Sequence, residues 1–303
     1  MSENQRDLVG YGAEPPRADW PGGARVAVSL VLNYEEGGEH NVLDGDAASE
    51  GFLHEVVGAP PVTGGRDLNV ESMFAYGSRA GFWRVHRTVR AHGVPLTVHA
   101  VGQALERNPD AARAMGAAGW EVAGHGWRWI DHRDVPEDVE RADIARTAAT
   151  IERLVGRRPV GWYTGRTSPA TRRLVVGQGG FLYDSDDYSD DLPFYVEVAG
   201  RPHLVVPYSL DANDFKFLIV HGFTTADDML AYLVDTFDTL HAEGAGGAAR
   251  MMSVGLHCRI IGRPGRVRAL DGFLTYVAQR GGAWVATREQ IARHWLAAHP
   301  PPS

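Results

Sequence analysis

The sequence contains a single cysteine and a single lysine among its 303 residues. One cysteine, Cys258, excludes an intrachain disulfide and a cysteine-based zinc site, so any metal site needs histidine and carboxylate ligands. No apolar run approaches the roughly 18 residues of a membrane span. The polar start of the chain also lacks the apolar run of a signal peptide. We therefore expect a cytoplasmic protein that does not bind membranes.

Net positive charge is also lacking. The 30 basic residues are outnumbered by 38 acidic ones, for a net charge of −8, and an acidic chain without a basic footprint is a poor candidate for binding nucleic acid. No internal repeat marks a solenoid or a propeller. Hydrophobic residues make up 44% of the chain, which excludes a disordered protein and suits an enzyme with a large core.

Apolar, strand-like runs alternate with amphipathic, helix-like segments along the chain. The helix-like segments are 78–92, 136–154, 266–280 and 287–299, and Asn108, Ser168 and Thr225 are placed to begin further helices. The strand-like runs are 25–32, 96–101, 120–123, 160–163, 181–185, 204–209, 251–256 and 283–285.

Strands that alternate with helices predict βα units and a mostly parallel sheet. Seven to eight such units favour a single-domain (β/α) barrel over an open sheet. We expect this barrel to span residues 21–299, after an N-terminal extension, 1–20, and before a short tail, 300–303. Two stretches without periodicity, 35–69 and 184–201, are expected to be loops that cover a site.

Two adjacent acids, Glu35 and Glu36, follow directly on the first strand-like run. In a parallel α/β fold, residues just beyond the carboxyl ends of strands line the active site. Carboxylates that crowd each other split their pKa values, which leaves one able to act as a base near neutral pH. A solvated acidic turn is the alternative interpretation, because such turns are common on protein surfaces.

Three further strand ends carry polar or aromatic residues. His125 follows 120–123, with Trp127 and Trp129 as an aromatic wall for a flat ligand. Arg166 follows 160–163 and is suited to hold a carboxylate or polarise a carbonyl. His257 follows 251–256 and is suited to act as a general acid toward a leaving nitrogen. Each residue alone also fits a structural or surface role, but together they match the way a barrel assembles one site.

The strand ending in two acids and glycine, the later His-Gly segment, the Gly-aromatic loop and the late Leu-x-His resemble the polysaccharide deacetylase family. The resemblance implies a distorted (β/α) barrel and, in most members, a zinc ion. It implies that Glu35 is the catalytic base, Glu36 the second acid, His125 the first histidine and His257 the general acid.

The chain departs from the deacetylase pattern where the metal is held. Trp129 stands where a second metal-binding histidine is usual, and Tyr163 replaces the arginine that opens the third motif. A catalytic zinc ion takes three protein ligands and one open position, whereas only Glu36 and His125 remain. We therefore expect no resident metal or other cofactor, with weak binding of a divalent ion at Glu36 and His125 left open.

These departures are similar to one branch of the family, the metal-independent bacterial allantoinases, over nearly the whole chain. That branch opens the hydantoin ring of allantoin to give allantoate in purine catabolism, and its members are homo-oligomers, so we expect a dimer or tetramer. The runs that carry the resemblance are VLNYEEGGE (31–39), ESMFAYGSRAG (71–81), HGWRWID (125–131), GWYTGRTSPATRRLV (161–175), HLVVPYSLDANDFKF (203–217) and GLHCRIIGRPGR (255–266).

The resemblance implies a cyclic amidohydrolase whose small-molecule substrate lies in a closed pocket. Besides Arg166, the residues expected to contact that substrate are Trp127, Trp129, Tyr163, Asn213 and Asp214. Two alternatives stay open. Phe215 and Lys216 replace the Met-Arg usual in that branch, which leaves room for another hydantoin or a cyclic imide. A zinc-dependent deacetylase of N-acetylated sugars is the second alternative.

Overall fold

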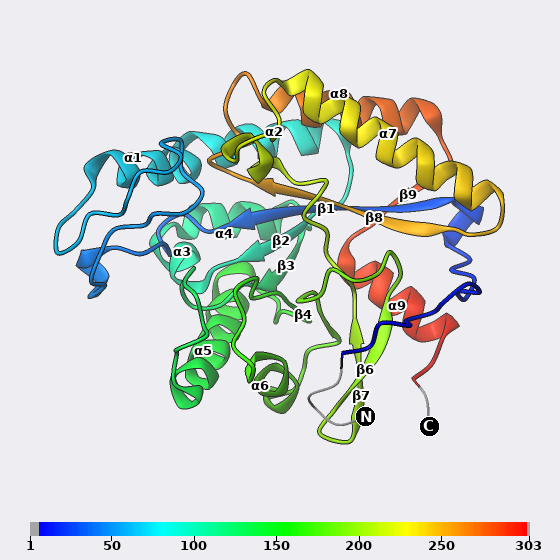
Figure 1. Cartoon of the computed structure of the whole chain (residues 1–303), viewed down its shortest axis with the longest axis horizontal. Coiled ribbons are helices and arrows are strands. Elements are labelled where there is room, and N and C mark those ends of the chain that lie inside the picture. Colours follow the sequence, from blue (N-terminus) through cyan, green and yellow to red (C-terminus); the bar gives the residue numbers. More distant parts are fainter. Residues whose placement is uncertain (1–5, 302–303) are drawn as a thin grey trace.

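A long buried strand, β1 (Val26–Tyr34), runs through the middle of the protein in this computed structural model, which describes residues 6–301 (Figure 1). All nine of its residues are buried. Strand β1 pairs in parallel with β2 (Thr97–Ala100) on one side and with β8 (Arg250–His257) on the other. The short strand β9 (Ala283–Val285) also pairs with the first residues of β1. Because both faces are covered, β1 is apolar almost throughout, as in other parallel sheets.

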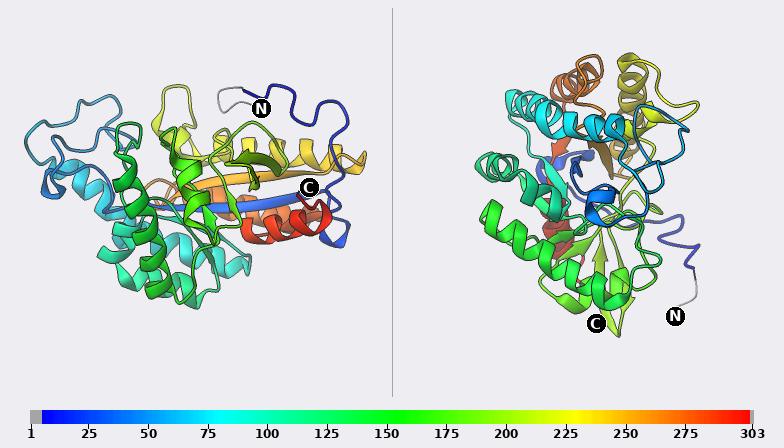
Figure 2. Two further views of the ribbon diagram at one scale, coloured as in Figure 1. Left: turned by 90° about the horizontal axis from the view of Figure 1, so that it is seen from below. Right: turned by 90° about the vertical axis from the view of Figure 1, so that its left-hand side faces the viewer.

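Within residues 6–301 the sheet has nine strands, in the order β6-β7-β5-β4-β3-β2-β1-β8 with β9 beside β1. Every pair is parallel except β6 with β7. The eight-strand path curls into an incomplete barrel, which confirms the predicted distorted (β/α) barrel (Figure 2). The remaining strands are β3 (Glu121–Gly124), β4 (Gly161–Trp162), β5 (Tyr183–Asp184), β6 (Phe194–Val198) and β7 (Arg201–Val205).

Helices surround the curled sheet (Figure 2), and most of them share one apolar cluster with β1. In Figure 1, α2, α7 and α8 lie above β1, while α3 to α6 lie below it. The helices are α1 (Leu68–Tyr76), α2 (Phe82–His92), α3 (Gly102–Arg107), α4 (Pro109–Ala117), α5 (Glu137–Val155), α6 (Thr171–Gln178), α7 (Ala226–Ala245), α8 (Val267–Arg280) and α9 (Arg288–Ala298). Shorter helical turns are η1 (Pro21–Gly23), η2 (Val42–Asp44), η3 (Gly77–Gly81) and η4 (Asp214–Leu218).

Capping residues explain why several helices begin where the sequence predicts. The Thr225 side chain accepts a hydrogen bond from the Asp228 amide, and Asp228 returns the bond to form a capping box. Asn108 caps α4 in front of Pro109. The helix predicted to begin at Ser168 is α6, which begins later, at Thr171.

Several expectations differ from the structure. Helix α1 was not predicted, and the strand expected over 204–209 is found earlier, as β7. The stretch 184–201, expected to be a loop, contains β6, whose residues pair antiparallel with β7 across the turn at Ala199 and Gly200. The short helix α3 was not predicted, because its six residues are too few to show a helical period. The stretch 35–69 is largely irregular, as expected, and its only helical features are η2 and the start of α1.

The expected domain boundaries remain a prediction, and residues 1–5 and 302–303 of the expected extension and tail lie outside the described residues. Nearer the barrel, Ala18 and Trp20 are buried in an apolar cluster with Trp295 of α9.

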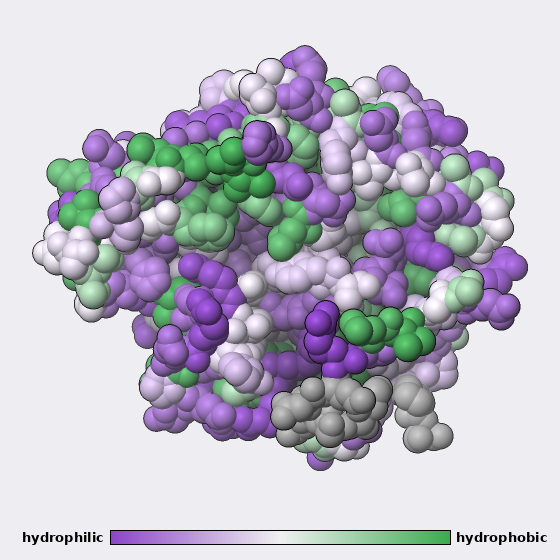
Figure 3. Space-filling model, viewed as in Figure 1, coloured by the Kyte–Doolittle hydropathy of each residue, from purple (hydrophilic) through white to green (hydrophobic). Residues whose placement is uncertain are grey.

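Across residues 6–301 no helix combines the length and apolar character that crossing a membrane requires. Apolar patches do reach the surface (Figure 3), and the exposed apolar residues of the 35–69 loop are Leu43, Phe52, Val56, Val57, Val62 and Leu68.

Close backbone packing at Gly81 yields a test of the fold. A Cβ atom there would meet the carbonyl group of Cys258 far inside van der Waals contact. We expect Gly81→Ala to lower the free energy of unfolding by about 1–3 kcal/mol, measured by chemical denaturation. Gly177→Ala, on α6 where a Cβ meets nothing within 4 Å, should raise it by roughly 0.5–1 kcal/mol. Equal effects of the two substitutions would contradict the packing described.

Candidate active site

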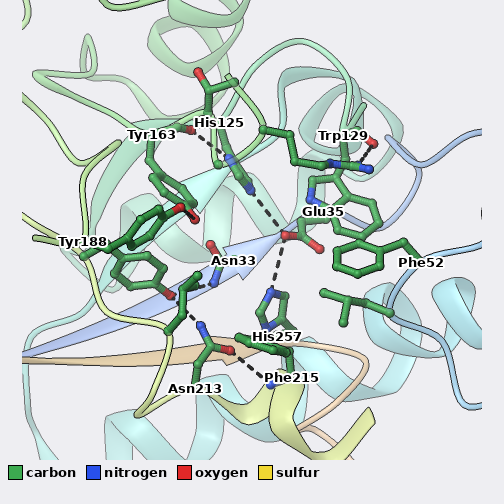
Figure 4. Close-up of a pocket in the computed structure, with 16 residues that line it drawn as sticks. Asn33, Glu35, Phe52, His125, Trp129, Tyr163, Tyr188, Asn213, Phe215 and His257 are labelled. Carbon is green, nitrogen blue, oxygen red and sulfur yellow. Dashed lines mark hydrogen bonds and ion pairs between the residues drawn. The ribbon is translucent and has the colours of Figure 1, made fainter. Parts of the chain in front are cut away.

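A cavity of about 220 Å³ opens at the carboxyl ends of β1, β3, β4 and β8 (Figure 4). Each strand delivers polar or aromatic side chains to the same place, which is the usual position of an active site in a (β/α) barrel. The lining residues are Asn33, Glu35, Phe52, Leu53, His125, Trp129, Tyr163, Thr164, Gly165, Arg166, Tyr188, Tyr208, Leu210, Asn213, Phe215 and His257.

Glu35 stands at the centre of this cavity and is only 2% exposed. One carboxylate oxygen, Oε1, lies 3.3 Å from Nε2 of His125 and 3.5 Å from Nε2 of His257. The other, Oε2, accepts a 2.7 Å hydrogen bond from Nη1 of Arg259. Figure 4 shows the two histidines on opposite sides of Glu35. Three elements far apart in sequence thus converge on one carboxylate.

The ring of His125 is fixed from behind. Its Nδ1 lies 2.7 Å from the carbonyl oxygen of Tyr163. Because a carbonyl only accepts, this nitrogen carries the proton and donates it, and Nε2 faces Glu35. The Tyr163 ring also stacks on the imidazole, with centroids 5.1 Å apart. The end of β4 thereby orients the histidine at the end of β3.

His257 is oriented by a buried carboxylate. Its Nδ1 lies 2.6 Å from Oδ1 of Asp214, while Oδ2 of Asp214 accepts the backbone N–H groups of His257 and Ile261. Asp214 is fully buried at the start of η4. Glu35, His257 and Asp214 therefore form a line of alternating charge, in which the histidine lies between two carboxylates.

The charges around Glu35 and His257 separate their pKa values. Burial acts to lower the pKa of His257, but the negative charges of Glu35 and Asp214 raise it to about 9. Burial acts to raise the pKa of Glu35, but the positive charges of Arg259 and His257 hold it well below its usual range. At neutral pH the site therefore contains an ionised carboxylate beside a protonated imidazole, a base and an acid ready for use.

Arg259, which was not among the residues predicted from the sequence, is the third partner of the Glu35 carboxylate. The residue is 3% exposed. Its Nε donates to the carbonyl oxygen of Leu53 at 3.1 Å. The guanidinium carbon lies 4.4 Å from the ring centre of Phe74 and 4.9 Å from that of Trp129. Its place two residues after His257, at a strand end, is the signal that identifies it.

Glu36 lies behind the cavity wall rather than in it. Its Oε1 accepts the backbone N–H of Arg259 at 3.0 Å, and its Oε2 accepts that of Glu35 at 3.2 Å. Burial and the neighbouring charge of Glu35 raise the pKa of Glu36, against the opposing effect of Arg259. Gly77 packs directly on this carboxylate, where a Cβ would collide with it. The second acid thus anchors the Arg259 backbone.

The residues present do not fit the zinc ion that the family resemblance implies. Among the residues that the structure describes, no three His, Cys, Asp or Glu side chains are grouped to hold a metal ion. Both oxygens of Glu36 are engaged by backbone N–H groups, of Glu35 and of Arg259. The position beside both carboxylates is filled by the guanidinium of Arg259, 2.7 Å from Glu35 and 3.6 Å from Glu36.

The remaining predicted site residues divide between the cavity and its surroundings. Arg166, Trp129, Tyr163 and Asn213 line the cavity together with Glu35, His125 and His257, whereas Glu36 does not. Trp127 lies outside it, packed beneath the guanidinium of Arg146 at 3.5 Å, and Asp214 lies beneath His257. Contact with a substrate therefore does not follow from the positions of Trp127 and Asp214. The lining residues that the sequence analysis did not select are Asn33, Phe52, Leu53, Thr164, Gly165, Tyr188, Tyr208, Leu210 and Phe215.

The loop that carries Arg166 is held by a buried acid. Asp186 accepts the backbone N–H groups of Thr164 and Gly165 at 2.7–2.9 Å. Burial and the nearby charge of Asp184 raise the pKa of Asp186 to about 7. Arg166 itself donates from Nη2 to the carbonyl oxygen of Trp129 and stacks on that indole ring, 4.3 Å from its centre. Its guanidinium is therefore fixed at the cavity wall.

Known proteins with the same sequence pattern and fold can be set beside this geometry. The sequence profile of the polysaccharide deacetylase family matches residues 66–175. A Schizosaccharomyces pombe protein that carries a polysaccharide deacetylase name is 43% identical, over 97% of this chain and 98% of its own length.

Two solved structures superpose on nearly the whole chain, each with a TM-score of 0.95 and 53% identity. One is the allantoinase PuuE, with 97% of this chain and 98% of that chain covered. The other is a Pseudomonas aeruginosa protein that carries a polysaccharide deacetylase name, with 97% and 99% covered. The two names describe different reactions, since one is a ring opening and the other a deacetylation.

The contact between His257 and Asp214 predicts a measurable titration. We expect His257 to titrate with a pKa of about 9, followed by NMR of ¹⁵N-histidine-labelled protein. Asp214→Asn removes one of the two charges that raise this pKa and should shift the titration to lower pH. The matched control is Asp211→Asn, which removes a carboxylate that bonds Ser209 and Tyr232 instead and should leave His257 unchanged. A wild-type value near 6.5, or no response to Asp214→Asn, would contradict the geometry.

Proposed function

The chain belongs to the polysaccharide deacetylase family, and on that basis we propose that it hydrolyses a small cyclic ureide, allantoin, to allantoate. The observation that carries the proposal is the cavity of about 220 Å³ that has Glu35 and His257 side by side in its lining. Cavities of this size hold compact ligands rather than polymers. The 53% identity to the allantoinase PuuE supports this substrate over other ring ureides.

In the proposed reaction, Glu35 acts as the general base and His257 as the general acid. Glu35 takes a proton from a water molecule as its oxygen bonds to a ring carbonyl carbon. The ring C–N bond then breaks, and His257 gives its proton to the departing nitrogen. The two products of the cleavage stay joined through the rest of the ring, so a single carboxylate product forms.

The carbonyl oxygen gains negative charge as water adds, and stabilising it is usually a large contribution to catalysis. We assign this role to the guanidinium N–H groups of Arg166, which lines the cavity. Arg259 supplies a fixed positive charge beside both acids, so the proposed reaction uses no resident metal or other cofactor. Weak binding of a divalent ion at Glu36 and His125 is tested by the same chelation experiment below.

The proposal also places the protein in purine catabolism in the cytoplasm, as a homo-oligomer of two or four copies. Its partner is the small-molecule substrate, with no role for nucleic acid or membrane.

Two alternative substrates have specific support. Phe215 lines the cavity where the allantoinase branch usually has methionine. This difference favours another hydantoin or a cyclic imide as the substrate. The polysaccharide deacetylase names of two close relatives favour deacetylation of N-acetylated sugars.

A substrate panel with and without chelator separates these functions. We expect purified protein to convert allantoin to allantoate, with hydantoin and dihydrouracil turned over less well. The rate should survive exhaustive chelation, because Arg259 rather than a metal ion lies beside the acids. Acetate release from N-acetylglucosamine oligomers would identify a deacetylase instead. Loss of activity on chelation and its return with zinc would show that the metal-free account is wrong.

A further inference from the structure

Asn33, at the end of β1, has a buried polar atom without a partner. The residue lines the cavity and is 2% exposed. Its Oδ1 is among the buried side-chain atoms of residues 6–301 that lack a hydrogen-bond partner. Leaving such an acceptor unpaired in the interior is costly, so a native protein retains one where something else completes the bond.

The orientation of this amide is determined by its surroundings. The Asn33 Nδ2 group lies 3.2 Å from the carbonyl oxygen of Leu256 and 3.1 Å from the hydroxyl of Tyr208. A carbonyl oxygen only accepts, so the amide nitrogen has to face Leu256. Oδ1 is therefore left on the other side of the amide, and Figure 4 shows Asn33 between Tyr163 and His257.

Tyr208 presents the complementary group beside Asn33. Its hydroxyl oxygen accepts from Asn33 Nδ2 and, at 3.2 Å, from Asn213 Nδ2. The Asn213 amide is oriented too, because its Oδ1 accepts the backbone N–H of Phe215. Neither bond uses the hydroxyl proton of Tyr208, and within the described residues no acceptor for it is found. Burial raises the pKa of Tyr208, so this group remains a donor.

The cavity lining thus carries an acceptor, Asn33 Oδ1, and a donor, Tyr208 O–H, on two side chains that are hydrogen-bonded to each other. An amide inside a five- or six-membered ring is cis, so its C=O and N–H point to the same edge. An open-chain secondary amide, such as an N-acetyl group, is trans, and its two groups point in opposite directions. One adjacent donor and acceptor can satisfy both groups of the first kind at once, but not of the second.

We propose that Asn33 and Tyr208 are the specificity-determining residues of the cavity and read the C=O and N–H edge of a cyclic amide or ureide. Asn33 Oδ1 accepts the ring N–H, and the Tyr208 hydroxyl donates to the adjacent carbonyl. This inference rests on the proposed function, since it states how the same cavity selects a ring substrate. It also predicts that an acetamido sugar is a poor ligand.

The first test compares hydantoin with its two N-methyl isomers. We expect methylation of the nitrogen that faces Asn33 to lower kcat/KM by about 10- to 100-fold. Asn33→Leu, of similar shape but without the acceptor, should lower kcat/KM for hydantoin by a similar factor and leave that isomer nearly unchanged. Tyr276→Phe, which removes a hydroxyl bonded to Asp238 far from the cavity, is the control and should behave like the wild type.

The second test measures binding alone and needs no turnover. Chemical-shift changes of the wild-type protein are followed with 2-pyrrolidinone, a cis lactam, with 1-methyl-2-pyrrolidinone and with N-methylacetamide, a trans amide. We expect the lactam to bind at least tenfold more tightly than the other two, and Tyr208→Phe to remove that preference. This result remains readable even if the protein opens no ureide ring, so failure of the proposed function is distinguished from failure of this inference.

Two results would overturn the inference. If Asn33→Leu lowered kcat/KM equally for hydantoin and both methyl isomers, Asn33 would have only a structural role. If the wild type bound lactam and trans amide equally, the unpaired groups would be satisfied by water and would select nothing. Should Asn33→Leu fail to fold, the lactam comparison on the wild type and on Tyr208→Phe still decides the question.

Discussion

The ion pair between Glu35 and Arg259 is the interaction on which the rest of the site depends. Both side chains are buried, and taking charges out of water is costly unless each has a close partner. Arg259 has Glu35 at 2.7 Å, the Leu53 carbonyl oxygen and two aromatic faces. The pair thereby ties the end of β1 to the end of β8 and to the irregular 35–69 loop. Removing one partner of such a pair typically costs about 3–5 kcal/mol.

Because of this ion pair, the two carboxylate oxygens of Glu35 have different partners. Oε2 is committed to Arg259, while Oε1 faces His125 and His257 at the cavity. The oxygen that remains available to water is thus the one nearest the protonated His257. Their different environments make Glu35 the base and His257 the acid. Enzymes use such pairs to carry out acid and base catalysis near neutral pH.

The strand-end motifs allowed much of this site to be predicted from sequence. Residues that follow β1, β3, β4 and β8 converge because the carboxyl ends of parallel strands meet at one edge. What could not be predicted is side-chain direction. Glu35 and Glu36 are adjacent, and only the structure shows that the first enters the cavity and the second bonds the backbone of Arg259. Asp214 looked like a substrate contact but orients His257.

Arg259 was missed for a related reason. It is one of 30 basic residues, and most of these are expected at the surface. Burial of Arg259 beside two acids depends on the ends of the paired strands β1 and β8 meeting the loop at Leu53, which no local pattern encodes. The strand β6 was missed because acidic residues precede it and hide a short alternating run. In both cases tertiary contacts, rather than local propensity, decide the outcome.

The most direct test of the account is the pH dependence of kcat/KM after replacing Arg259. The charge of Arg259 helps keep Glu35 ionised, so Arg259→Met should raise the pKa of Glu35 and move the acid limb of the profile to higher pH. Arg259→Lys, which keeps the charge, should move it less, and the control Arg263→Met, whose guanidinium lies over Tyr76, should not move it. An acid limb unchanged in folded Arg259→Met protein would contradict the central role of this ion pair.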